Sequence, residues 1–131
     1  MGSFSNYWEN KLLDHIFGKG NLTPPVIYLG LLTAEPDDDG TGLAEPSGNG
    51  YQRVQTSASH WNVSTGGSLD NTGDIFFPMA TGNWGTVSHF ALFDASTGGN
   101  MLAYGTLSPA KIIGSGAIAK FVAGDLTVNL D

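Results

Sequence analysis

The spacing of apolar residues predicts one amphipathic helix near the start of the chain. Trp8, Leu12 and Ile16 recur at every fourth position, which places them on one face of a helix. Gly18 follows the last of them and can end a helix in the left-handed conformation. We therefore expect a helix over about residues 5–17, packed on a sheet through this apolar stripe.

The pattern changes to that of strands from residue 26 onward. Residues 26–32 are a continuous apolar run, which is typical of a strand buried on both faces. In residues 86–94 polar and apolar positions alternate, so that Val87 and Phe93 are expected on one face and Phe90 on the other. Further strands are expected at residues 51–56, 60–63, 74–78, 101–107, 111–113, 118–122 and 126–130.

This succession of short strands indicates the fold class. About eight strands follow the helix, with turn-forming residues roughly every 8 to 12 positions, and no alternation of helices with strands suggests a parallel sheet. The sequence therefore predicts an all-β protein, an antiparallel β-sandwich or jelly-roll-like domain with one N-terminal amphipathic helix. A length of 131 residues fits a single domain covering residues 1–131.

Composition narrows the function classes. The chain has 5 basic and 12 acidic residues and a formal net charge of −7, which argues against binding to nucleic acid or to an anionic membrane surface. Cysteine is absent, which removes disulfides, thiolate nucleophiles and cysteine-ligated zinc. The N-terminal segment lacks the cationic start and the uninterrupted apolar core of a signal peptide. Synthesis in a reducing cytoplasm is consistent with this composition.

An acidic stretch at residues 33–50 is the first candidate for chemistry. Glu35, Asp37 and Asp39 fit the first three ligand positions of an EF-hand loop whose sixth residue is Gly40, but Pro46 then occupies the twelfth, where glutamate is required. A solvated turn is favoured because clustered like charges usually lie in water, and a weak calcium site stays open. Catalysis by two of these acids would need a cleft that desolvates one of them.

Other residue patterns do not indicate an active site. His15, His60 and His89 lack the spacing of metal ligands and are expected to be hydrogen-bonded structural residues. No Gly-x-Ser-x-Gly elbow and no phosphate-binding loop is present in the sequence. We therefore predict that the protein is not an enzyme and that it has no catalytic residue, no cofactor and no metal ligand.

Several stretches together carry a resemblance to a known family. They are SNYWENKLLDHIFG, PPVIYLGLLTAEP, GLAEPSGNGYQRV, FPMATGNWGTVSHFALFDASTGGNMLAYGTL and FVAGDLTVNLD, in chain order. This set resembles a family of small virion proteins of tailed bacteriophages, labelled as structural or tail-fibre-like proteins. The resemblance implies a non-enzymatic structural protein of the virion, made in the cytoplasm of the bacterial host.

Two roles follow from the resemblance. The first is a capsid decoration or cement protein on the head surface, bound to the major capsid protein and to copies of itself as a homo-trimer or dimer. The alternative is a tail-fibre or baseplate component involved in host attachment. Apolar and aromatic residues at the helix, the acidic stretch and the turns are candidates for a partner interface: Trp8, Leu12, Ile16, Leu43, Tyr51, Trp84 and Ile118.

Overall fold

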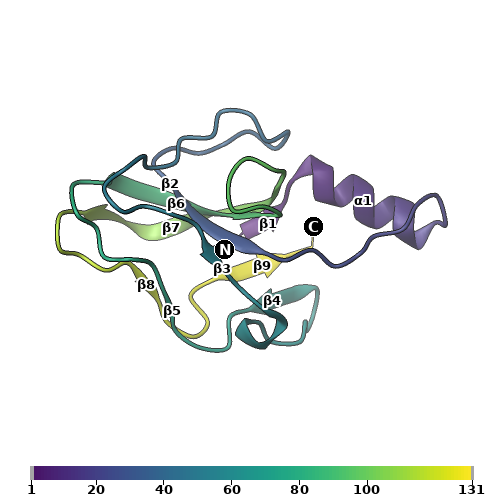
Figure 1. Ribbon diagram of the computed structural model, residues 1–131. Coiled ribbons are helices and arrows are strands. Elements are labelled where there is room, and N and C mark those ends of the chain that lie inside the picture. Colours follow the sequence, from purple (N-terminus) through teal and green to yellow (C-terminus); the bar gives the residue numbers. More distant parts are fainter. Residues whose placement is uncertain (1, 131) are drawn as a thin grey trace.

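The fold is a curled seven-stranded sheet with one helix at its side, shown in a computed structural model that describes residues 2–130 (Figure 1). The strand order in the sheet is β3-β2-β6-β7-β1-β9-β4, and β5 and β8 form a separate two-stranded ladder. The strands are β1 (Gly2–Phe4), β2 (Tyr28–Leu32), β3 (Val54–Gln55), β4 (Ser68–Asp70), β5 (Ile75–Phe76), β6 (Gly85–Phe93), β7 (Met101–Ile113), β8 (Lys120–Phe121) and β9 (Thr127–Asn129).

Strands β6 and β7 form the central hairpin of the sheet. Their register runs from Phe93 opposite Met101 to Gly85 opposite Ile113. All five residues of β2 pair with the other side of β6, from Tyr28 opposite Phe93 to Leu32 opposite His89. The loop at residues 94–100 is closed by the Asp94 carboxylate, which accepts hydrogen bonds from the backbone N–H and the side-chain amide of Asn100 at 2.7 and 2.9 Å. The sequence prediction of a hairpin at this position is confirmed.

The predicted purely antiparallel sheet is wrong, because the N-terminal residues form a strand that pattern reasoning missed. Strand β1 enters between β7 and β9, antiparallel to the first and parallel to the second. Only a residue without a side chain fits at Gly2, since an added Cβ would lie 2.7 Å from the Tyr104 carbonyl oxygen and 2.9 Å from Cζ of Phe90. Three residues carry no detectable period, so tertiary pairing alone defines this strand.

The main core lies on one face of the sheet. There Leu29, Phe90 and Leu102 pack with Trp84 and with side chains of the loops and of the β5–β8 ladder. The opposite face carries a smaller buried group, Leu32, Ala91, Phe93 and Met101. The layer that covers the main core is the β5–β8 ladder, which has two residue pairs and is completed by loops. A sandwich or jelly roll requires a full second sheet at this place, and residues 2–130 do not form one.

Three details of the predicted strands also differ in the structure. Val87 packs in the main core beside Phe90 and not with Phe93, because the register shifts between Val87 and His89 and the alternation is reset there. The segments expected at residues 101–107 and 111–113 are one continuous strand of 13 residues. Strand β4 is an addition to the predicted strands, and it lies in a run of mostly Ser, Thr, Gly, Asn and Asp residues at 64–73 that interrupts the apolar pattern.

The helix α1 (Asn6–Ile16) and a short 3₁₀ turn, η1 (Ala58–His60), complete the elements. Ser5 caps α1: it is buried, its hydroxyl donates to the Met101 carbonyl at 2.5 Å, and its oxygen accepts weakly from the Trp8 N–H at 3.4 Å. From this anchor the helix points away from the sheet (Figure 1), and none of its residues is fully buried.

Candidate functional site

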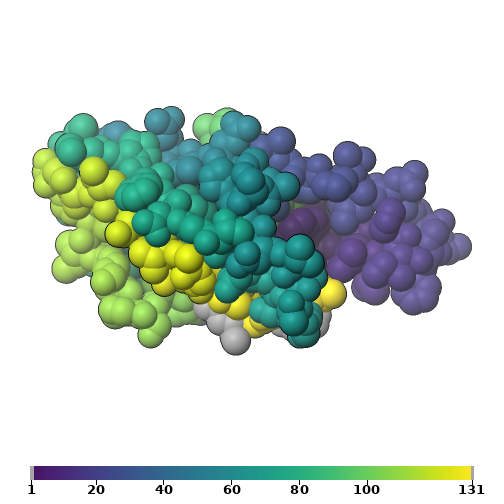
Figure 2. All heavy atoms as spheres, turned by 90° about the horizontal axis from the view of Figure 1, so that it is seen from below, coloured from purple at the N-terminus to yellow at the C-terminus, as the bar shows by residue number. Residues whose placement is uncertain are grey.

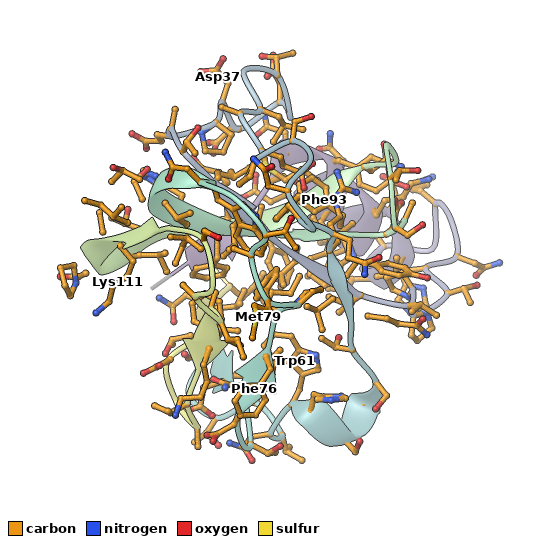
Figure 3. The ribbon with its side chains drawn as sticks, turned by 60° about the vertical axis from the view of Figure 1, so that its left-hand side comes forward. Asp37, Trp61, Phe76, Met79, Phe93 and Lys111 are labelled. Atoms are coloured by element: carbon orange, nitrogen blue, oxygen red, sulfur yellow. The ribbon has the colours of Figure 1, made fainter. Side chains whose placement is uncertain are left out.

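The acidic stretch forms a loop that is held by its own hydrogen bonds. The Thr41 N–H donates to Asp39 Oδ1 at 3.0 Å, and the Thr41 hydroxyl lies 2.6 Å from the same oxygen and 3.1 Å from Asp37 Oδ2. These bonds from Thr41 hold the pKa of Asp39 below its usual range. Asp37 lies at the outer tip of the molecule in Figure 3, on the opposite side of the sheet from Phe76.

Asp38 ties this loop to the rest of the fold. Its carboxylate accepts a hydrogen bond from the Tyr104 hydroxyl on β7, and its backbone oxygen accepts from the Asn6 N–H at the start of α1, at 2.9 Å. The bond to Asp38 raises the pKa of Tyr104 to about 12, with a smaller contribution from desolvation. Across residues 2–130, no group of three or more His, Asp and Glu side chains is arranged to hold a metal ion.

A second cluster, formed by Glu45, Tyr51 and Arg53, was missed from the sequence. Arg53 and Glu45 make two parallel contacts, Nη2 to Oε1 at 2.6 Å and Nε to Oε2 at 3.0 Å. The Tyr51 hydroxyl donates to Glu45 Oε2 at 2.6 Å and accepts from the Leu31 N–H at 3.0 Å. Burial, reinforced by the bond to Glu45, raises the pKa of Tyr51.

The guanidinium group of Arg53 also fastens the hairpin loop of the central strands. Its Nη1 donates to the carbonyl oxygens of Ala95 and Gly98 at 2.8 and 2.9 Å, and its carbon lies 3.5 Å from the centroid of the Phe93 ring. The charge of Arg53 is therefore used to hold these loops together, and its side chain is only 5% exposed. A signal was present in the sequence, because Arg53 is the one arginine of a chain poor in charge.

The structure places two of the predicted interface aromatics inside the fold. Trp84 is buried in the main core, where its Nε1 donates to the Asn49 carbonyl at 2.8 Å. Tyr51 is half-buried and meets the Trp84 ring edge-on at a centroid distance of 5.3 Å, and Phe77 joins both. Packing therefore accounts for these two aromatic residues without a partner.

The predicted helix residues divide along the length of α1. Trp8 and Leu12 are partly buried at the end near the sheet, and Trp8 lies against Phe4 with ring centroids 4.5 Å apart. At the far end Ile16 is 63% exposed, in contrast to the expected packing of the whole stripe on the sheet. Together with Leu13 and Phe17, 54% and 72% exposed, it forms an apolar patch that we call the helix tip.

Ile118 and Leu43 are the remaining predicted interface residues, and both are exposed. Leu43 belongs to the loop after the acidic turn and lies apart from the helix tip in sequence. Ile118 lines a groove of about 600 Å³ between the distal half of β7 and the turn leading to β8. We call it the β7 groove; its buried floor is Leu31, Val87, Ile113 and Phe121, and its rim includes Lys111, Ile112, Ile118 and Lys120.

The three histidines have local structural contacts. The Nδ1 atom of His15 accepts from the Leu22 N–H at 3.2 Å, and that of His60 accepts from the Ser57 N–H at 2.9 Å. His89 shares a hydrogen bond of 2.8 Å with the hydroxyl of Ser88. The prediction that the three histidines are hydrogen-bonded is therefore confirmed.

Comparison with known proteins identifies a family. The family model described as "Podophage GP4 fiber I protein gp80" matches residues 3–129, which is almost the whole chain. No curated protein matches the sequence.

In the part of the chain that the structure describes, α1 is too short and too polar to cross a lipid bilayer, and no other helix is long and apolar enough to do so.

Proposed function

The chain belongs to the podophage GP4 fiber I protein gp80 family, and we propose that it serves in the virion as a component of the fibre that contacts the host. Membership of this family makes the chain a structural protein of a phage virion. The observation that carries the fibre assignment is the family match over residues 3–129, since the family's description names a fibre protein.

We further propose that the protein works by adhesion and not by catalysis. The acidic residues that could serve as catalytic pairs have other partners: Asp37 and Asp39 are bonded to Thr41, Asp38 to Tyr104, and Glu45 to Arg53. A glycosidase would instead need two carboxylates facing one sugar, with the pKa of one raised by burial. Incubation of the purified protein with host envelope polysaccharide or peptidoglycan tests this proposal: release of reducing sugar would contradict it.

Localisation of the protein in intact virions tests the fibre role. Antibody-labelled gold should bind in few copies at the tail end of the particle. A phage that lacks the gene should form filled heads of normal stability and adsorb poorly to its host. Labelling spread over the whole head would overturn this assignment.

Head decoration is the second candidate, with the major capsid protein as its partner. The net charge of −7 suits an outer surface and opposes contact with packaged DNA, and a ligand that binds only the assembled shell stabilises it by mass action. Co-sedimentation with empty heads, together with increased resistance of those heads to heat, would support decoration. If the protein stays in the supernatant at saturating concentration, the head-decoration role is ruled out.

A further inference from the structure

We propose that a pocket beside strand β3 binds a neutral sugar unit, through which the fibre holds an uncharged polysaccharide of the host envelope. The inference rests on the proposed function for the source of the sugar, because the fibre role makes the host surface the partner. The aromatic and amide lining of the pocket, its place at the edge of the sheet and its neutralised charge point to this class of ligand.

The pocket lies where the edge of the sheet meets the layer that covers the main core. It has a volume of about 610 Å³ and is lined by Tyr28, residues 52–55, Ser96 and residues 76–78. We call it the edge pocket, because β3 is the last strand in the order of the sheet. Figure 2 views the molecule from the side of the covering layer, where the teal segment that contains β5 lies beside the yellow segment that contains β8. A volume of this size is typical of a small-molecule site and has room for one or two sugar rings.

Aromatic side chains give the edge pocket an apolar surface. Phe76 lines it and is 55% exposed, and Tyr28 is half-buried in the same lining. In Figure 3 Phe76 lies at the margin of the molecule, far from the acidic loop at Asp37. A pyranose ring has a face made of C–H bonds, and such a face packs on an aromatic ring.

Polar groups of the lining match the hydroxyl groups of a sugar. Gln52 and Gln55 are exposed, and each amide offers both donors and an acceptor, to which the hydroxyl of Ser96 adds a third polar side chain. The backbone of Gln55 also faces outward, because the next N–H, that of Thr56, bonds to the Ile27 carbonyl and alternate residues of an antiparallel strand turn away from the neighbouring strand. A purely apolar ligand would leave these groups without partners.

The charge of the lining disfavours anions and metal ions. Among the described residues that line the edge pocket, Arg53 is the one cation, and its guanidinium group is paired with Glu45 and bonded to two carbonyl oxygens of the hairpin loop. The same residues include no carboxylate, so a metal ion lacks its preferred ligands and a glycosidic bond lacks an acid to cleave it. Lys120 lies opposite Phe76 in the ladder, with Nζ 6.0 Å from the ring centroid, and it lines the β7 groove instead.

An extended peptide is a poorer match than a sugar. Peptides that add a strand to a sheet gain affinity from a row of backbone hydrogen bonds. Strand β3 consists of Val54 and Gln55, so its edge offers only a short row. A compact ring that contacts Phe76 and the two amides uses the groups that the lining presents.

A chemical-shift titration of the full chain tests the proposal. The probes are the methyl glycosides of glucose, galactose, mannose and N-acetylglucosamine, and at least one should shift the amide signals of Gln52, Gln55 and Ser96 with a Kd on the order of 1 mM. Phe76→Ser and Gln52→Ala/Gln55→Ala should each weaken that binding at least about tenfold. Met79→Ser, at a position that is also 55% exposed and lies outside the lining, is the matched control and should bind normally. All of these side chains are exposed, so the fold should persist, which circular dichroism checks.

The charge of the probe gives a second comparison. The uronic acid form of the sugar that binds carries a carboxylate in place of its CH₂OH group. It should bind more weakly, because the cation in the lining is already paired and the chain has a net charge of −7. Equal or tighter binding of the acid would overturn the proposal that the ligand is neutral.

These results are separable from the fibre role. The sugar site is overturned, and the fibre role stands, if none of the four sugars shifts any signal, if the shifts map away from the edge pocket, or if Phe76→Ser binds normally. Localisation on the head would overturn the fibre role and the envelope as the source of the sugar, whereas sugar binding by the purified protein would stand. A phage that carries Phe76→Ser should show normal labelling at the tail and reduced adsorption. Normal adsorption of that phage would overturn the envelope polysaccharide as the ligand.

Discussion

Arg53 and Glu45, eight residues apart in the chain, face each other with two parallel contacts of 2.6 and 3.0 Å. This pair connects three loops, since Tyr51 bonds to the same carboxylate and Arg53 reaches the carbonyl oxygens of the hairpin loop. A planar guanidinium group is required for this arrangement, because lysine cannot donate in a fork.

Breaking this pair should destabilise the protein. Arg53→Met leaves Glu45 in a largely desolvated position without its partner, and we expect the free energy of unfolding to fall by about 2–4 kcal/mol in urea titrations. The double variant Glu45→Gln/Arg53→Met should lose less than the sum of the two single changes, which is the signature of a direct interaction. Lys19→Met, an exposed change of similar type, is the control and should stay within about 0.5 kcal/mol. Additive losses would contradict the coupling.

Trp84→Ala should act on stability and not on binding. Trp84 is 5% exposed and packs against Tyr51 and Phe77, so its removal opens a cavity that costs about 3–5 kcal/mol. Urea unfolding measures the loss, and Leu43→Ala, at a 40% exposed position, provides the comparison with a change of about 1 kcal/mol or less. A stable Trp84→Ala variant that fails to join virions would instead return this residue to the interface.

Alkaline pH should weaken the attachment of the acidic loop. The folded pKa of Tyr104 is raised to about 12, above the ordinary value of about 10, so the neutral phenol is favoured in the folded state. Its contribution to stability is therefore complete below about pH 10 and is lost as the pH rises through about 12. Absorbance of tyrosinate near 295 nm follows the titration. Tyr104→Phe should remove one late-titrating phenol, whereas Tyr7→Phe, which keeps the Asp38 bond, should retain it.

Gly2→Ala should displace strand β1. A Cβ atom there would meet the carbonyl oxygen of Tyr104 and the ring of Phe90, and we expect a loss of about 1–3 kcal/mol in urea unfolding. Gly73→Ala is the matched control, because an added Cβ at that glycine has no neighbour within 4 Å. Hydrogen exchange should also become faster at Ser5, whose N–H donates to the Leu102 carbonyl. Equal stability of the two variants would show that β1 contributes little to the fold.

The spacing of apolar residues along the chain was sufficient to predict the longer helix and strands. The helix, the apolar strand β2 and the hairpin of β6 and β7 are each long enough for hydrophobic spacing to define them. Composition and charge also defined the surface, since a chain with 13% charged residues must present Ser, Thr, Asn and Gly to water.

The tertiary structure decided what depends on residues that are distant in sequence. The parallel pairing of β1 with β9 joins the two ends of the chain. Arg53 joins its loop to the hairpin loop at Ala95, and Asp38 joins the acidic loop to β7 at Tyr104. Which apolar residues of α1 are covered depends on where Ser5 anchors the helix, so the sequence could not show that Ile16 is exposed. Spacing along the chain reports the faces of an element, whereas the neighbour of each face is chosen by packing and hydrogen bonding in three dimensions.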